Sequence, residues 1–127
     1  MVVAETQGAN ALAASLEAGE LVTLDGITSI AKSLGAATVS ETVFNRCMDL
    51  GGDKVRPWVT TDEVATRACA TFLDDHRVLV EPACGAGLAA VYEQSPQLTS
   101  LNLSTSDTVV VEVCGGSDPV IPYPVQL

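Results

Sequence analysis

Helical signals alternate along this chain with short apolar runs typical of buried strands, and this alternation restricts the fold to the α/β class. Helix formers, glycine stops and Ser or Thr caps predict helices over residues 9–18, 28–34, 40–50, 61–73 and 81–93. Apolar and β-branched runs predict strands at residues 2–4, 55–59, 78–80 and 107–114, the last being the strongest strand signal. Pro57 places its strand at a sheet edge, because proline cannot donate to the ladder.

Length and charge narrow the classes of protein. The chain has 127 residues, enough for one compact domain, and 47% hydrophobic against 17% charged residues is a globular composition. A net charge of −10 disfavours nucleic acid and anionic membrane surfaces as partners. We expect a cytoplasmic protein, since the N-terminus has no basic segment followed by an apolar core and no apolar run reaches about 20 residues.

The four cysteines do not form a metal or redox motif by spacing. Cys47, Cys69, Cys84 and Cys114 include no pair two residues apart, and reduced thiols are the expectation. Cys84 stands near a predicted helix start, where a thiol can act as a nucleophile, and His76 would be its base. The solvated charges around His76 weigh against this cysteine-enzyme interpretation.

Two further patterns carry chemistry. The predicted strand at residues 107–114 ends in Cys114 and is followed by Gly115 and Gly116, at the kind of strand end where α/β sheets bind ligands and where glycines let a flat ring approach. The alternative is a buried cysteine followed by a turn. Glu5 follows the first strand, where its carboxylate could bind a hard cation or cap the next helix.

Three segments together resemble one enzyme family. Leu-Val-Glu-Pro-Ala-Cys-Gly-Ala-Gly-Leu-Ala-Ala at 79–90, the Cys-Gly-Gly-Ser ending at 114–117 and residues 20–34 are similar to the serine dehydratase branch of fold-type-II pyridoxal-phosphate enzymes, in the same order and separation. The resemblance implies a three-layer α/β fragment of the large cofactor domain over residues 1–117, followed by a divergent proline-rich tail at 118–127. It implies L-serine or L-threonine ammonia-lyase activity in amino-acid metabolism, including gluconeogenesis, and a homodimer at full length.

The resemblance also implies site residues. Cys114 would lie beside the pyridine nitrogen of pyridoxal 5'-phosphate, with Gly115 and Gly116 giving the ring room. Glu5 and the backbone carbonyls of Ala9, Leu34 and Ala36 would hold a monovalent cation, usually potassium. By the same comparison Cys84 becomes a packing residue under the cofactor sheet.

This chain departs from the family pattern at the segments that carry the catalytic and phosphate-binding residues. The family's cofactor-binding lysine lies in a Ser-Phe-Lys motif and its phosphate site in a glycine-rich loop, and neither sequence is present here; Lys32 and Lys54 lack that context. We therefore expect a truncated chain without catalytic residues of its own, inactive alone and marginal in folding. The alternative is a non-catalytic short isoform that binds full-length subunits or another partner through the strand edge at residues 2–4.

Overall fold

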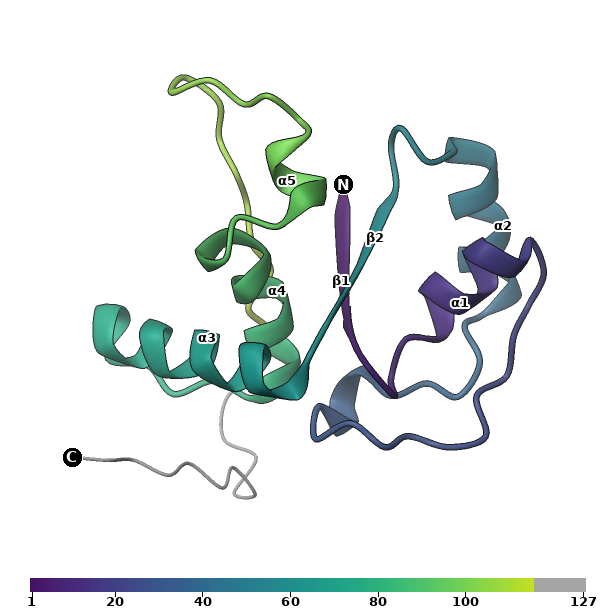
Figure 1. The fold of residues 1–127 in the computed structure, drawn as a ribbon, viewed down its shortest axis with the longest axis horizontal. Coiled ribbons are helices and arrows are strands. Elements are labelled where there is room, and N and C mark those ends of the chain that lie inside the picture. Colours follow the sequence, from purple (N-terminus) through teal and green to yellow (C-terminus); the bar gives the residue numbers. More distant parts are fainter. Residues whose placement is uncertain (116–127) are drawn as a thin grey trace.

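A two-stranded sheet lies between two pairs of helices in the computed structural model, which describes residues 1–115 (Figure 1). Helices α1 and α2 cover one side of the sheet, and α3 and α4 the other, so the predicted three-layer α/β arrangement is confirmed. The elements in chain order are β1 (Val2–Thr6), α1 (Ala11–Ala18), the 3-10 helix η1 (Lys32–Leu34), α2 (Glu41–Leu50), β2 (Arg56–Thr60), α3 (Asp62–His76), α4 (Pro82–Tyr92) and α5 (Pro96–Thr99).

The two strands run parallel, and their alternating side chains build two separate cores. Ala4 pairs with Trp58, and Val3 with Pro57. Val3 packs toward α1 and α2 with Leu12 and Val55, whereas Trp58 packs against α3 and α4. The two short strands therefore position both helix pairs, one pair on each face of the sheet.

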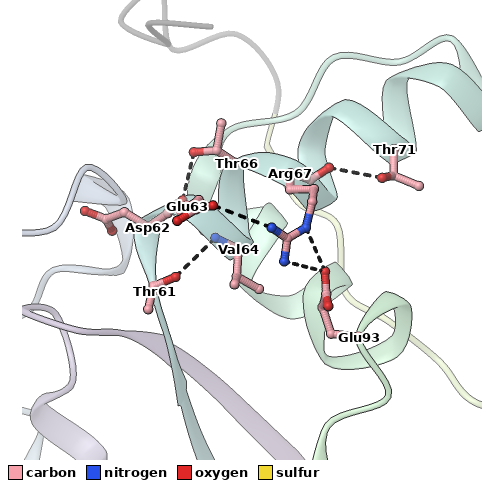
Figure 2. Close-up of polar contacts among 8 residues, drawn as sticks. All are labelled: Thr61, Asp62, Glu63, Val64, Thr66, Arg67, Thr71 and Glu93. Carbon is pink, nitrogen blue, oxygen red and sulfur yellow. Dashed lines mark hydrogen bonds and ion pairs between the residues drawn. The ribbon is translucent and has the colours of Figure 1, made fainter. Parts of the chain in front are cut away.

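Helix α3 begins where the sequence predicts a cap and is tied to α4 on its surface (Figure 2). The Thr61 hydroxyl accepts a hydrogen bond from the Val64 amide at 3.2 Å, which satisfies one free N–H of the first turn. The Arg67 guanidinium donates to Glu93, just after α4, at 2.9 and 3.0 Å. Both side chains are partly solvated, so this ion pair contributes at most about 1 kcal/mol.

Close packing of α3 on α4 depends on a glycine. Gly85 is buried, and a Cβ there would meet the Ala65 carbonyl oxygen and lie 2.5 Å from the Cys69 sulfur. Around this contact Ala68, Cys69, Val80, Cys84, Leu88 and Ala89 form the main buried cluster. The small residues of α4 thus allow its backbone to approach α3.

Three sequence predictions of secondary structure are wrong. Residues 28–34 form only η1, because the Ser29 hydroxyl and the Ile30 amide both bond to the Asp62 carboxylate at 2.5 and 3.1 Å rather than to a helix of their own. Residues 78–80 pair with no strand within residues 1–115; Val80 instead packs into the α3–α4 core with 1% of its surface exposed.

The third wrong prediction concerns the strongest strand signal. Residues 107–114 form no ladder within the described chain, because no described segment lies beside them as a partner. Val110 is 87% exposed as a result. The short helix α5 was not predicted, and Gly116, Ser117 and the proline-rich tail at 118–127 lie outside the described residues. Within residues 1–115 no helix is long and apolar enough to cross a membrane.

The α3–α4 contact yields a prediction with a matched control. Gly85→Ala should destabilise the chain by about 1–3 kcal/mol, since the added methyl meets backbone that cannot move aside. Gly87→Ala, two residues along the same helix, should be neutral or stabilising by up to about 1 kcal/mol, because its nearest new contact is at 3.8 Å. Urea unfolding followed by the fluorescence of Trp58 measures both; equal effects of the two variants would contradict the packing described.

Candidate cofactor site

A cavity of about 680 Å³ lies between the start of β1, one face of α4 and the extended segment at residues 108–114. Small side chains of α4 line it, namely Ala83, Gly87 and Ala90, and Cys114 faces it from the extended segment. In Figure 1 this extended segment and β1 run in the same direction, from the top of the view to the bottom. No peptide group of residues 108–113 hydrogen-bonds to another described residue, so both walls of the cavity offer backbone for pairing.

Cys84 holds the end of the extended segment against α4. The Gly115 amide donates to the Cys84 sulfur at 3.3 Å, and the Cys84 thiol donates to the Gly115 carbonyl at 3.6 Å. Cys84 is itself buried in the α3–α4 core. The predicted packing role of Cys84 thus includes a direct hydrogen-bonded contact with the backbone beside Cys114.

Gly115 lies against Glu81, a residue to which sequence reasoning gave no role. A Cβ at position 115 would lie 2.6 Å from one Glu81 carboxylate oxygen, the mobile end of that side chain, so a larger residue here would require the carboxylate to shift. The need for glycine beside a cofactor ring stays a prediction, and the close neighbour in this structure is Glu81. The Glu-Pro dipeptide at the start of α4 marks Glu81 in the sequence. Its contact with Gly115, 34 residues further along, cannot be found from any local pattern.

The Cys114 thiol is exposed and is kept in its neutral form. Its pKa is raised, chiefly by repulsion between its thiolate form and that of the neighbouring Cys84, and also by partial desolvation and the charge of Glu112. A neutral thiol can donate or share a hydrogen bond with a ring nitrogen. The neutral thiol and the small-residue wall of α4 together fit one side of a flat, nitrogen-containing ring.

Glu5 caps α1, the second of the two roles that its position allowed. Its carboxylate oxygens accept hydrogen bonds from the Leu12 and Ala13 amides at 3.0 and 2.8 Å. Burial raises the pKa of Glu5, and these two amide bonds lower it by less. The carboxylate is thus a buried anion supported by the helix start.

The other predicted cation ligands lie on two segments, which a backbone hydrogen bond joins at Gly8 and Thr28. Ala9 is in the turn after β1, and the preceding residue, Gly8, accepts a hydrogen bond from Thr28 at 3.1 Å. Leu34 and Ala36 follow along that second segment and are joined by a 3.0 Å backbone bond. The described residues contain no cluster of three His, Cys, Asp or Glu side chains suited to a metal, so a cation here would depend on carbonyls.

The cysteine-enzyme interpretation has no geometric support within residues 1–115. The ring of His76 lies against Phe72, with ring centroids 4.4 Å apart, at the exposed end of α3. Cys84 makes its hydrogen bonds to Gly115. The described residues therefore show no nucleophile–base pair of the kind this chemistry needs.

The fold and this site define a pyridoxal-phosphate enzyme of fold type II. The family model of pyridoxal-phosphate dependent enzymes matches residues 1–115, and the chain belongs to that family. It is 48% identical over 121 residues to a rat serine dehydratase-like protein and 42% identical to a human L-serine dehydratase/L-threonine deaminase. Both matches cover 93% of this chain and 36% of the relative, so the chain spans about a third of the length of these proteins.

Solved structures agree with the sequence comparison. A fungal L-serine ammonia-lyase from Rhizomucor miehei superposes with a TM-score of 0.82 at 37% identity, over 92% of this chain and 36% of that one. Maize serine racemase superposes with a TM-score of 0.63 at 28% identity, over 77% of this chain and 31% of that one. The resemblance stated from the sequence is confirmed at the level of family and fold.

The buried position of Glu5 predicts a pH dependence of stability. Because the pKa of Glu5 in the folded chain lies above its ordinary value of 4.5, the folded state holds this proton more tightly than the unfolded state does. The stability that Glu5 contributes is therefore fully present below pH 4.5 and declines as the pH rises through the raised pKa. The difference in unfolding free energy, wild type minus Glu5→Gln, should fall over that range.

Urea titrations at a series of pH values measure this difference. Glu17→Gln, an exposed change in α1, the helix whose first turn bonds to Glu5, serves as the control and should show no such trend. If the stability of the wild type relative to Glu5→Gln grew with pH, the two amide hydrogen bonds from α1 would affect the pKa of Glu5 more than its burial does, contrary to this prediction.

Proposed function

We propose that this chain forms the C-terminal wall of the cofactor pocket of a pyridoxal-phosphate-dependent ammonia-lyase acting on L-serine or L-threonine. The reaction is an α,β-elimination that gives pyruvate or 2-oxobutanoate and ammonia. The observation that carries the proposal is Cys114, a thiol that lines a cavity together with the small residues Ala83, Gly87 and Ala90 of α4. The names of the relatives, dehydratases and an ammonia-lyase, supply the reaction.

The cofactor brings the electron sink for this chemistry, and the chain's residues position it. Cys114 would hydrogen-bond the ring nitrogen through a shared proton, without adding a charge to it. Cys84 would fix the position of the Cys114 thiol by its hydrogen bond with the Gly115 backbone. Gly115 and Gly116 would leave the ring edge uncovered.

The catalytic groups come from outside this sequence in the proposal. Lys32 donates to the Ile27 carbonyl at 2.8 Å from an exposed position in η1. Lys54 lies in the loop before β2. Neither lies among the residues that line the cavity, so neither is assigned the cofactor-binding role.

A potassium ion would bind beside the end of β1. Glu5 would offer its remaining carboxylate lone pairs, and Ala9, Leu34 and Ala36 their carbonyl oxygens. An ion there would tie the turn after β1 to the end of η1, whose Leu34 lines the cavity. We further propose that the assembled enzyme is a cytoplasmic homodimer, with the amino acid as its small-molecule partner.

A chimera tests the proposal with this chain's own residues. The segment of human L-serine dehydratase/L-threonine deaminase that matches this chain is replaced by the present sequence, and pyruvate release from L-serine is followed with coupled lactate dehydrogenase. We expect turnover from the chimera and none from the chain alone. Cys114→Ala should lower the rate roughly 10- to 100-fold, as expected for loss of a buried hydrogen-bond partner, and Cys114→Ser should retain most of it.

Control variants distinguish a chimera that does not fold from a folded chimera that lacks the proposed activity. Cys47→Ser, in the core beside α1 and α2, should leave turnover unchanged. A chimera that has a native circular dichroism spectrum and binds cofactor, yet releases no pyruvate, would contradict the proposed function. So would full activity of Cys114→Ala.

The second candidate function is a non-catalytic short isoform that associates with full-length subunits. The open backbone of residues 108–113 and the exposed Val110 favour it, because such an edge pairs readily with a strand of another chain. Val110→Asp should then reduce capture of a full-length family member at least 10-fold, since an unpaired carboxylate would be buried. Val43→Asp on α2, 46% exposed, is the matched control; equal capture by both variants would contradict this candidate.

A further inference from the structure

Two of the four cysteines lie side by side in space although they are 30 residues apart in the sequence. The Cys84 sulfur is 3.3 Å from the Gly115 nitrogen, and that nitrogen is bonded directly to the Cys114 carbonyl carbon. A peptide C–N bond is about 1.3 Å long, so the Cys84 sulfur lies within about 5 Å of the Cys114 backbone. Cys84 and Cys114 also line the same cavity.

The two thiols differ in their exposure to solvent, and this difference determines which of them reacts first with an oxidant. Cys114 is exposed, whereas Cys84 is 4% exposed and packed in the α3–α4 core. An oxidant would reach Cys114 first, and the Cys84 sulfur already contacts Gly115, the residue that follows Cys114. Cys47 belongs to the other core cluster, and Cys69 donates to the Glu81 carbonyl from α3.

We propose that Cys84 and Cys114 form a reversible disulfide when the protein meets a hydroperoxide. The Cys114 thiolate attacks one peroxide oxygen, the O–O bond breaks, and a sulfenic acid forms with release of water after protonation. The Cys84 sulfur then attacks the Cys114 sulfur and expels a second water. Two thiols lose two electrons and two protons in total, and one hydrogen peroxide is reduced to two waters.

The expected consequences follow from the position of the pair. The bond would fix the end of the extended segment to α4 and would remove the thiol that faces the cavity. Because the pKa of Cys114 is raised, the thiolate is scarce at neutral pH, and the rate should keep rising with pH beyond the ordinary range of a thiol. The inference uses only this chain's residues and does not rest on the proposed lyase activity.

Peptide mapping of the full 127-residue chain tests it. The chain is treated with hydrogen peroxide, remaining thiols are alkylated, and trypsin with a Glu-specific protease separates residues 78–93 from residues 113–127. We expect a linked pair of these two peptides, loss of two of the four thiols, and full recovery on reduction. The link should persist in Cys47→Ser and vanish in both Cys84→Ser and Cys114→Ser.

Other outcomes overturn the inference without needing any variant to fold. Four free thiols after treatment, or a main product that joins Cys69 to Cys84, would exclude the pairing. The same reaction in urea should give mixed pairs, because the native contact is absent there. Mixed pairs in native buffer as well would show that the fold does not select these two cysteines.

Discussion

The close crossing of α3 and α4 at Gly85 is the contact on which the described site depends. Because position 85 has no side chain, α4 lies against the Ala65 backbone and the Cys69 sulfur, and its small residues then turn toward the cavity. The same helix carries Cys84, which binds the backbone of Gly115. A displaced α4 would move the cavity wall and the thiol of Cys114 together, so packing and chemistry are set by one helix.

An open sheet is the second constraint. Strand β1 pairs with β2 along one edge, and its other side faces the cavity across which residues 108–114 run unpaired. A β-branched segment with exposed Val110 and free peptide groups has the chemistry of an interior strand without its neighbours. The chain spans about a third of its relatives, and strands from a longer polypeptide would supply the neighbours that the lyase proposal needs.

Local hydrogen bonding explains which features could be predicted. The caps at Ser40 and Thr61 depend on residues three positions away, and both were found where the sequence indicated. Residues 28–31 were misassigned because their partner, Asp62, lies over 30 residues further along. The residues of the Cys84–Gly115 contact are 31 positions apart, and nothing local marks it. For Glu5 the sequence pattern allowed either a cation site or a helix cap, and the bonds to α1 are visible only in the folded structure.

In the proposed function, Cys114 would stand at the ring nitrogen of a bound cofactor while residues 108–114 pair within a completed sheet. A crystal structure of the cofactor-loaded chimera measures this directly. We expect the Cys114 sulfur within about 3.5 Å of the pyridine nitrogen, at hydrogen-bonding distance, with Cys84 still bound to Gly115. A ring nitrogen that faces another side chain, or residues 108–114 left unpaired beside the bound cofactor, would contradict it.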